Sequence, residues 1–140
     1  MDTSPLTFAQ SAAYAPRLDV LESTGSTNAD LVAAVSTAPY EWPEGSVLVT
    51  TDQRHGRGRL DREWTTPPGS ALAVSVLVHA DGLPMEARGW LSLISGMAMT
   101  RAVARVLRAT SHTVELKWPN DVLVDGKKIC GILAEAVRTD

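Results

Sequence analysis

The order of helical and extended stretches is the feature that most constrains the fold of this chain. Apolar and β-branched runs predict strands at residues 46–51, 71–79, 113–117, 122–124 and 128–136. Asp125-Gly126, between the last two, is a type I′ hairpin signal. A short helix precedes the first strand, and a long helix separates the second strand from the third. This order predicts an α+β fold, with a mixed, largely antiparallel sheet and helices on one side, rather than repeating βαβ units.

The short helix is predicted from its capping side chains. Ser26-Thr27-Asn28 can cap a helix, and Thr27 and Asp30 have the T-x-x-D spacing of a capping box. An apolar run follows, and we expect the helix to end before Pro39. Hydroxyls, an amide and backbone N–H groups converge at such a start, which suits a neutral polar ring or an anion. A helix cap with no further role is the alternative.

Two longer segments carry predictions about packing. Residues 71–79 are apolar at nearly every position, which predicts a central strand covered on both faces. The pattern from about Met85 to Arg108 predicts the longest helix. Its expected apolar face holds Leu91, Ala98, Ala102 and Val106, with Met99 and Val103 beside them. Its arginines, which are Arg101, Arg105 and Arg108, are expected to form a solvated outer face.

Composition bounds the class of protein. The 140 residues fit one ordinary domain, which we divide into a loosely ordered lead-in over 1–20 and a folded part over 21–140. A net charge of −3 argues against general nucleic-acid binding. The arginines at 57–62 are a local positive feature on this mildly acidic chain, which suits a small anionic ligand better than a polyanion. Cys130 is the only cysteine, so no intrachain disulfide or cysteine-based metal site is expected. With no signal peptide and no apolar run of about 20 residues, we expect a cytoplasmic protein without membrane contact.

The nine residues Gly56–Trp64, GRGRLDREW, predict an anion-binding loop. Glycine lets backbone amides approach a ligand, and arginine supplies planar charged forks for phosphate or carboxylate oxygens. The segment lacks the GKS or GKT of a Walker loop, and Asp61 stands where a GxGxxG fingerprint has its third glycine. A solvated surface turn is the alternative.

A third segment, KWPNDVLVDGKKICGILAE, runs from Lys117 to Glu135. Proline fixes its own φ and restricts the residue before it, so Trp118-Pro119 predicts a rigid, partly buried corner that holds Lys117 in a defined direction. We expect Asn120 and Asp121 mainly to build the turn.

Taken together in this order, STGSTNADL at 23–31, the arginine loop and the 117–135 segment resemble the biotin–protein ligase family over roughly Leu21 to Val137. The resemblance implies the fold shared by class II aminoacyl-tRNA synthetases and biotin ligases. It also implies that 21–140 is the N-terminal portion of a catalytic domain. Only 25 residues precede Ser26, so we expect no helix-turn-helix domain and no DNA partner.

The resemblance also assigns roles to single residues. Lys117 and Arg59 are the implied catalytic residues. The implied biotin contacts are Ser26, Thr27, Asn28, Gln53, Arg57, Gly58, Arg59 and Lys117. The implied nucleotide or phosphate contacts are Gly56, Arg57, Arg59, Arg62, Trp64 and Asn120. The chain departs from the family at Arg54-His55, where small residues are common, and at Leu60-Asp61, where a basic residue and glycine are common.

The implied reaction has two steps. The biotin carboxylate attacks the α-phosphorus of ATP, which enters with Mg²⁺, and gives biotinyl-5′-AMP and pyrophosphate. A lysine of a biotin carboxyl carrier protein domain, part of a biotin-dependent carboxylase, then attacks the mixed anhydride and AMP leaves. No tightly bound metal is expected, and a homodimer is left open. The alternatives are a related lipoyl-type acyl ligase, and a module that binds biotin or biotinyl-AMP without turnover.

The resemblance implies further chain beyond the GILAE segment. Family members continue with another glycine-rich strand, more helices and a small β-barrel, whereas this sequence ends five residues after Glu135. We therefore expect the 128–136 strand to be an exposed edge, and catalysis by these 140 residues alone to be weak or absent.

Overall fold

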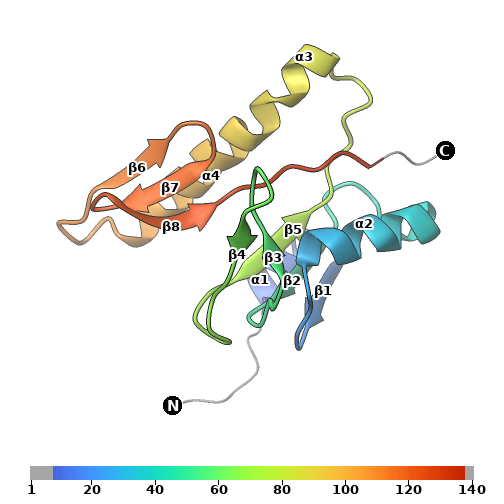
Figure 1. Cartoon of the computed structure of the whole chain (residues 1–140), viewed down its shortest axis with the longest axis horizontal. Coiled ribbons are helices and arrows are strands. Elements are labelled where there is room, and N and C mark those ends of the chain that lie inside the picture. The colour runs from blue at the N-terminus through green and yellow to red at the C-terminus, as the bar shows by residue number, and fades with distance from the viewer. Residues whose placement is uncertain (1–7, 138–140) are drawn as a thin grey trace. The chain divides into compact units, whose positions relative to one another are not determined.

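The computed structural model describes residues 8–137, which form two compact units. The first unit contains the chain up to Gly56, residues Glu63–His79 and the end from Val137. The second contains Arg57–Arg62 and Ala80–Ala136. Both units combine helices with a small sheet, so the predicted α+β class is confirmed (Figure 1).

The sheet of the first unit has the order β1-β2-β5, with β1 at Leu18–Leu21, β2 at Val47–Thr50 and β5 at Ala73–Val76. β1 runs parallel to β2 and β5 antiparallel to it, so the sheet is mixed as predicted. A short helix α1 (Ala9–Ala12) precedes β1. Ordered structure therefore begins within the segment expected to be a loose lead-in.

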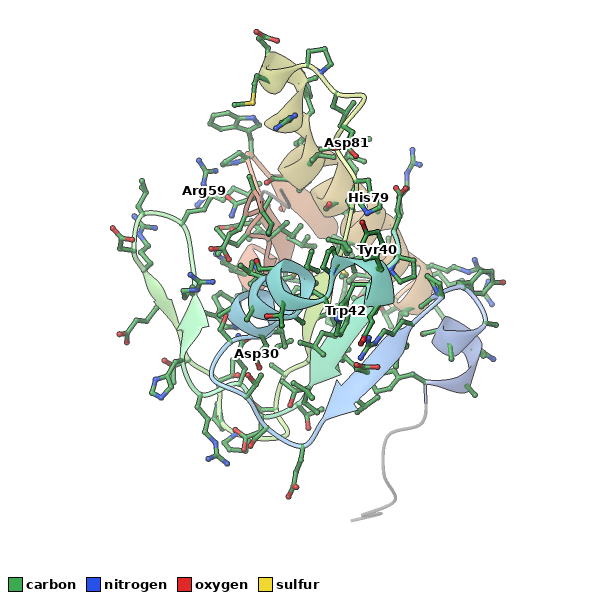
Figure 2. The ribbon with its side chains drawn as sticks, turned by 90° about the vertical axis from the view of Figure 1, so that its right-hand side faces the viewer. Asp30, Tyr40, Trp42, Arg59, His79 and Asp81 are labelled. Carbon is green, nitrogen blue, oxygen red and sulfur yellow. The ribbon has the colours of Figure 1, made fainter. Side chains whose placement is uncertain are left out.

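The helix α2 (Thr27–Thr37) packs on this sheet and ends before Pro39, as predicted (Figure 1). The core between them contains Leu31, Val35, Trp42 and Leu48. Trp42 follows the 3-10 helix η1 (Pro39–Glu41) and is buried, and the Arg17 guanidinium lies 3.7 Å from its ring centroid (Figure 2). The Arg17 side chain thus covers the ring of this core tryptophan with its charged group.

The predicted capping box is wrong by one residue. Ser26, not Thr27, is the N-cap, and its hydroxyl accepts from the Ala29 N–H at 3.4 Å. The Asp30 carboxylate instead accepts a hydrogen bond from the Thr24 hydroxyl. Thr27 is therefore the first helical residue, and its hydroxyl is available to another partner.

The prediction for residues 71–79 is also wrong in its packing. β5 is an edge strand whose Val74 and Val76 are exposed, while Ser75 between them is buried. Side chains alternate across a strand, so Ser75 faces α2 and the valines face the other side. An apolar run alone does not distinguish a central strand from an edge strand with one uncovered face.

The second unit consists of a helical segment against an antiparallel sheet. The sheet has the order β6-β7-β8, with β6 at Val114–Lys117, β7 at Asp121–Val124 and β8 at Lys127–Gly131. α4 (Trp90–Val106) packs on β6 and β7 (Figure 1). β8 ends five residues earlier than the predicted strand, and it is an edge strand as expected.

The predicted long helix is divided at Gly89 into α3 (Met85–Arg88) and α4. Four residues of its predicted apolar face line one pocket beside β7 and β8, namely Met99, Ala102, Val103 and Val106. This face is less buried than expected, because Val106 is 80% exposed and Ala98 and Ala102 are exposed as well. Gly96 is the buried residue of α4, and a Cβ there would lie 2.7 Å from Leu116 Cδ1. The packing of α4 on Leu116 of β6 thus depends on a glycine, which a search for large apolar residues overlooks. Arg101, Arg105 and Arg108 are exposed, as predicted.

The β7–β8 turn confirms the hairpin signal, because Asp125 and Gly126 have φ values of 50° and 74°. The Asp125 carboxylate accepts from the Thr113 N–H at 2.9 Å and lies 2.5 Å from His112 Nδ1. These two contacts, first the Thr113 N–H and then His112, lower the pKa of Asp125. Within residues 8–137, no helix is long and apolar enough to span a bilayer.

We predict that Gly126→Ala lowers the free energy of unfolding by about 1–2 kcal/mol, because alanine is strained at positive φ. Gly89→Ala is the control. An added Cβ meets nothing within 4 Å there, and φ is −60°, so this change should stabilise the chain by about 0.4–1 kcal/mol. Urea denaturation followed by circular dichroism measures both. Equal effects of the two variants would show that the turn conformation is not the cause.

Candidate functional site

A polar cluster at the start of α2 joins residues that are far apart in sequence. The Gln53 Oε1 accepts from the Thr27 N–H at 2.9 Å and from the Thr27 hydroxyl at 3.1 Å. The Ser75 hydroxyl lies 2.9 Å from Thr27 Oγ1 and 2.5 Å from Asn28 Oδ1. Thr27 and Ser75 are both buried. The structure therefore brings three predicted biotin contacts, Thr27, Asn28 and Gln53, into one network.

Backbone pairing brings these side chains together. The Arg54 N–H donates to Thr24 O at 2.9 Å and the His55 N–H donates to Gly25 O at 2.7 Å. The segment that leads into the arginine loop thus lies parallel to the segment that leads into α2, with a bridge between Thr24 and Gln53. Because this pairing is made by backbone groups, it fixes the position of Gln53 whatever its side chain does.

The orientation of the Gln53 amide follows from its partners. Both contacts to Thr27 use Oε1, so Nε2 lies on the other branch of the amide and can donate to a ligand carbonyl. Ser75 was missed by the sequence analysis. It is a hydroxyl within a run of apolar residues, and this break in the pattern is the signal that marks it.

Gly56 has no space for a side chain. A Cβ there would lie 2.4 Å from Trp64 O and 2.5 Å from Gln53 Nε2. In the structure the glycine lets the backbone approach Trp64 and Gln53, and the approach of its backbone to a ligand stays a prediction.

The predicted arginine loop is a narrow hairpin. Its strands are β3 (Gly56–Arg57) and β4 (Glu63–Trp64), and the Gly58 N–H donates to Arg62 O at 2.6 Å. Leu60 and Asp61 both have φ of 56°, the left-handed region that favours glycine. The family's glycine at one of these positions thus has a physical reason, and this chain accommodates the same turn with two non-glycine residues.

Within the second unit, two loop arginines contact the 117–135 segment. Arg57 Nη2 lies 2.9 Å from Glu135 Oε2, and Arg59 Nη1 donates to Asn120 Oδ1 at 3.4 Å. Figure 2 shows Arg59 on the turn of the hairpin. Arg62 contributes its carbonyl to the turn, and its side chain is exposed.

Asn120 has the turn-building role that was expected of it. Its Nδ2 donates to Ile132 O at 2.8 Å, and the Ile132 N–H donates to Asn120 O at 3.0 Å. The side-chain amide therefore connects Arg59 with the segment after β8. The assignment of Asn120 to the nucleotide stays a prediction.

Lys117 ends β6 and is exposed, opposite Asp121 in the antiparallel register. The Asp121 carboxylate binds Lys128 Nζ at 2.7 Å. Lys128, which the sequence analysis treated only as part of a strand, is thus a second lysine at the Lys-Trp-Pro-Asn-Asp corner. The corner is less buried than predicted, because Trp118 is 78% exposed.

The predicted site residues fall into both compact units. Ser26, Thr27, Asn28, Gln53, Gly56 and Trp64 belong to the first. Arg57, Gly58, Arg59, Arg62, Lys117 and Asn120 belong to the second. The first set offers neutral hydrogen-bonding groups, and the second offers cations. Among the residues that the structure describes, no group of three His, Cys, Asp or Glu side chains could hold a metal ion.

Each unit thus holds one group of the predicted site residues, and comparison with known proteins identifies the class of protein. The model of the biotin/lipoate A/B protein ligase family matches residues 20–140. The chain therefore belongs to this family.

The relatives that it resembles within the family are biotin ligases. It is 44% identical over 123 residues to the biotin–[acetyl-CoA-carboxylase] ligase of Mycobacterium tuberculosis, a match that covers 87% of this chain and 45% of the relative. It is 34% identical to the bifunctional ligase/repressor of Bacillus subtilis over 84% of this chain and 33% of that protein.

Solved structures agree with the sequence comparison. The biotin protein ligase of Leishmania major in complex with biotinyl-5-AMP aligns with a TM-score of 0.72 and 33% identity, over 86% of this chain and 52% of that one. The Aquifex aeolicus enzyme in complex with biotin and ATP aligns with a TM-score of 0.71 and 31% identity, over 88% and 48%. The chain thus spans about half the length of these proteins.

We predict that Gly56→Ala lowers the free energy of unfolding by about 1–3 kcal/mol, because a backbone oxygen opposes the added methyl group. Gly25→Ala, whose Cβ would meet only His55 Cδ2 at 3.8 Å, is the control and should change stability by less than about 1 kcal/mol. The Gln53 side-chain NH₂ signals in NMR spectra should move in the first variant only. Unchanged signals in Gly56→Ala would contradict the close packing of Gly56 on Gln53.

Proposed function

We propose that this chain carries the ligase activity that activates biotin as biotinyl-5′-AMP and transfers it to a lysine of a biotin carboxyl carrier protein. The observation that carries the proposal is the network of Thr27, Gln53 and Ser75 at the start of α2. A ureido ring has one carbonyl acceptor and two N–H donors. A fixed amide and two fixed hydroxyls supply partners of both kinds.

The second unit supports the acidic half of the reaction. Biotin carboxylate and ATP are both anions, so a catalyst must reduce their repulsion and stabilise charge at the α-phosphorus. Arg57 and Arg59 are each oriented by a hydrogen-bonded partner, and Lys117 stands at the end of a paired strand. Charges that are already oriented need no rearrangement when the reaction occurs. We assign catalysis to Arg59 and Lys117, and phosphate binding also to Arg57 and Arg62.

Mg²⁺ belongs to the substrate in this proposal. The Asp121 carboxylate is paired with Lys128, and the Asn120 amide is engaged by Arg59 and Ile132. These side chains are therefore committed to the structure of the corner. Mg²⁺ would enter with ATP and bridge its phosphate oxygens.

A lipoyl-type acyl ligase is the second candidate, because the matching family includes lipoate ligases. Both activities activate a carboxylate with ATP, so the neutral cluster distinguishes them. Lipoate carries a dithiolane ring without N–H or C=O groups, so its ring offers no carbonyl oxygen to the Gln53 side-chain NH₂.

Titration of the purified chain with biotin, with lipoate and with a non-hydrolysable phosphodiester analogue of biotinyl-5′-AMP tests the proposal. Exchange of pyrophosphate into ATP is measured in parallel. We expect the chain to bind biotin and to bind the analogue more tightly, and any exchange to depend on biotin. Binding of lipoate in preference to biotin, or of none of the three compounds, would refute the proposal.

We predict that Lys117→Ala weakens binding of the analogue roughly tenfold to a hundredfold, because a hydrogen bond to a charged group contributes about 1.5–3 kcal/mol. Lys127→Ala, a change of the same charge at the exposed β7–β8 hairpin, is the control. Lys128→Ala is measured beside them, since Lys128 binds Asp121 at the same corner. If Lys128→Ala greatly weakens binding of the analogue and Lys117→Ala does not, the ligand-binding lysine of this corner is Lys128.

Arg59→Gly is expected to speed the release of biotinyl-5′-AMP by a larger factor than it weakens the binding of biotin. The arginine is predicted to hold the phosphate of the intermediate, which biotin alone lacks. Dissociation of the analogue, followed by stopped-flow fluorescence, measures this effect. Identical dissociation rates in the original chain and the variant would count against a role for Arg59 in retention.

A further inference from the structure

Glu135 connects the end of the described chain to the arginine hairpin. Its Oε2 lies 2.9 Å from Arg57 Nη2, although the two residues are 78 positions apart in sequence. Neither the motifs nor the comparisons assign a role to this carboxylate. Since Arg57 is a predicted contact for biotin and phosphate, a side chain that orients its guanidinium bears on the site itself.

The segment that carries Glu135 is fixed in place. Asn120 binds Ile132 twice, through Asn120 Nδ2 to Ile132 O at 2.8 Å and through the Ile132 N–H to Asn120 O at 3.0 Å. Glu135 follows three residues later. The same Asn120 accepts from Arg59, so the two arginines are oriented by neighbouring parts of one hydrogen-bonded structure.

The geometry of the Arg57–Glu135 pair indicates that Glu135 orients the guanidinium and does not compete with a ligand for it. The contact to Glu135 uses Nη2, whereas a guanidinium has five N–H donors in a planar fork. The Arg57 side chain is 47% exposed and that of Glu135 only 28% exposed. The other donors of Arg57 can therefore bind a ligand while Glu135 holds Nη2. A solvent-exposed ion pair of this kind is weak, so it removes little of the attraction for an anion.

We infer that Glu135 is a positioning residue, which orders the Arg57 guanidinium for the acidic end of an acyl-adenylate. The inference rests on the proposed function. A long, flexible side chain loses rotamer freedom when a ligand immobilises it, and this loss lowers affinity. By pairing with Arg57, Glu135 restricts the rotamers of the Arg57 side chain during folding, so less freedom is lost when the ligand binds. The inference requires that the effect of Glu135 on the ligand passes through Arg57, and this dependence distinguishes it from a general structural role.

A double-mutant cycle with Arg57 tests the inference. We expect Glu135→Gln to weaken binding of the phosphodiester analogue roughly two- to tenfold in the original chain. In the Arg57→Ala background, the same change should have no further effect. Glu135→Asp, which keeps the charge, should recover part of the lost affinity. Glu86→Gln on α3 removes the same charge from an exposed position and should leave binding unchanged.

Each other outcome overturns the inference. Unchanged or tighter binding in Glu135→Gln would mean that the carboxylate is idle or competes with the ligand. An equal loss in both backgrounds would mean that Glu135 maintains the fold rather than Arg57. If the original chain binds neither biotin nor the analogue, the proposed function fails and this role fails with it. Tight binding by the original chain with no effect of Glu135→Gln refutes the role alone.

Discussion

The hydrogen bonds from Thr27 to the Gln53 amide are the interaction on which the neutral part of the candidate site depends. Thr27 begins α2, and Gln53 lies where the chain leaves β2 toward the arginine hairpin. Through Gln53 Oε1 the helix start and the entrance to the hairpin are fixed together, and Ser75 adds β5 to the same network. This network requires glycine at position 56, because a methyl group there would clash with the Gln53 side-chain amide.

The cationic part is organised by a different residue. Asn120 uses its side-chain oxygen for Arg59 and its side-chain nitrogen for Ile132, so it holds both a hairpin arginine and the segment that carries Glu135. The turn between β3 and β4 contains Leu60 and Asp61 at positive φ, which costs of order 1–2 kcal/mol for each non-glycine residue. The hairpin conformation is thus maintained by its contacts against its own backbone preference.

The sequence predicted those features that depend on local chemistry. The end of α2 before Pro39, the Asp125-Gly126 turn and the α+β order follow from residue types next to one another. It did not predict features that depend on neighbours distant in sequence. The burial of Ser75, the close approach at Gly96 and the pairing of Glu135 with Arg57 each require a partner more than 15 positions away. The edge position of β5 was missed for the same reason, since an apolar run does not reveal which of its faces is covered.

The proposal to test is that the neutral cluster of the first unit binds the ring of biotin and that the arginines of the second unit bind the phosphate of biotinyl-5′-AMP. NMR spectra recorded while biotin and then the biotinyl-5′-AMP analogue are added test it directly, with the Gln53 side-chain amide and the Arg59 Nε–H as reporters. The account predicts that biotin shifts the Gln53 signals. It also predicts that the analogue shifts the signals of both residues. Unchanged Gln53 signals on addition of biotin, or a response from only one of the two residues to the analogue, would contradict it.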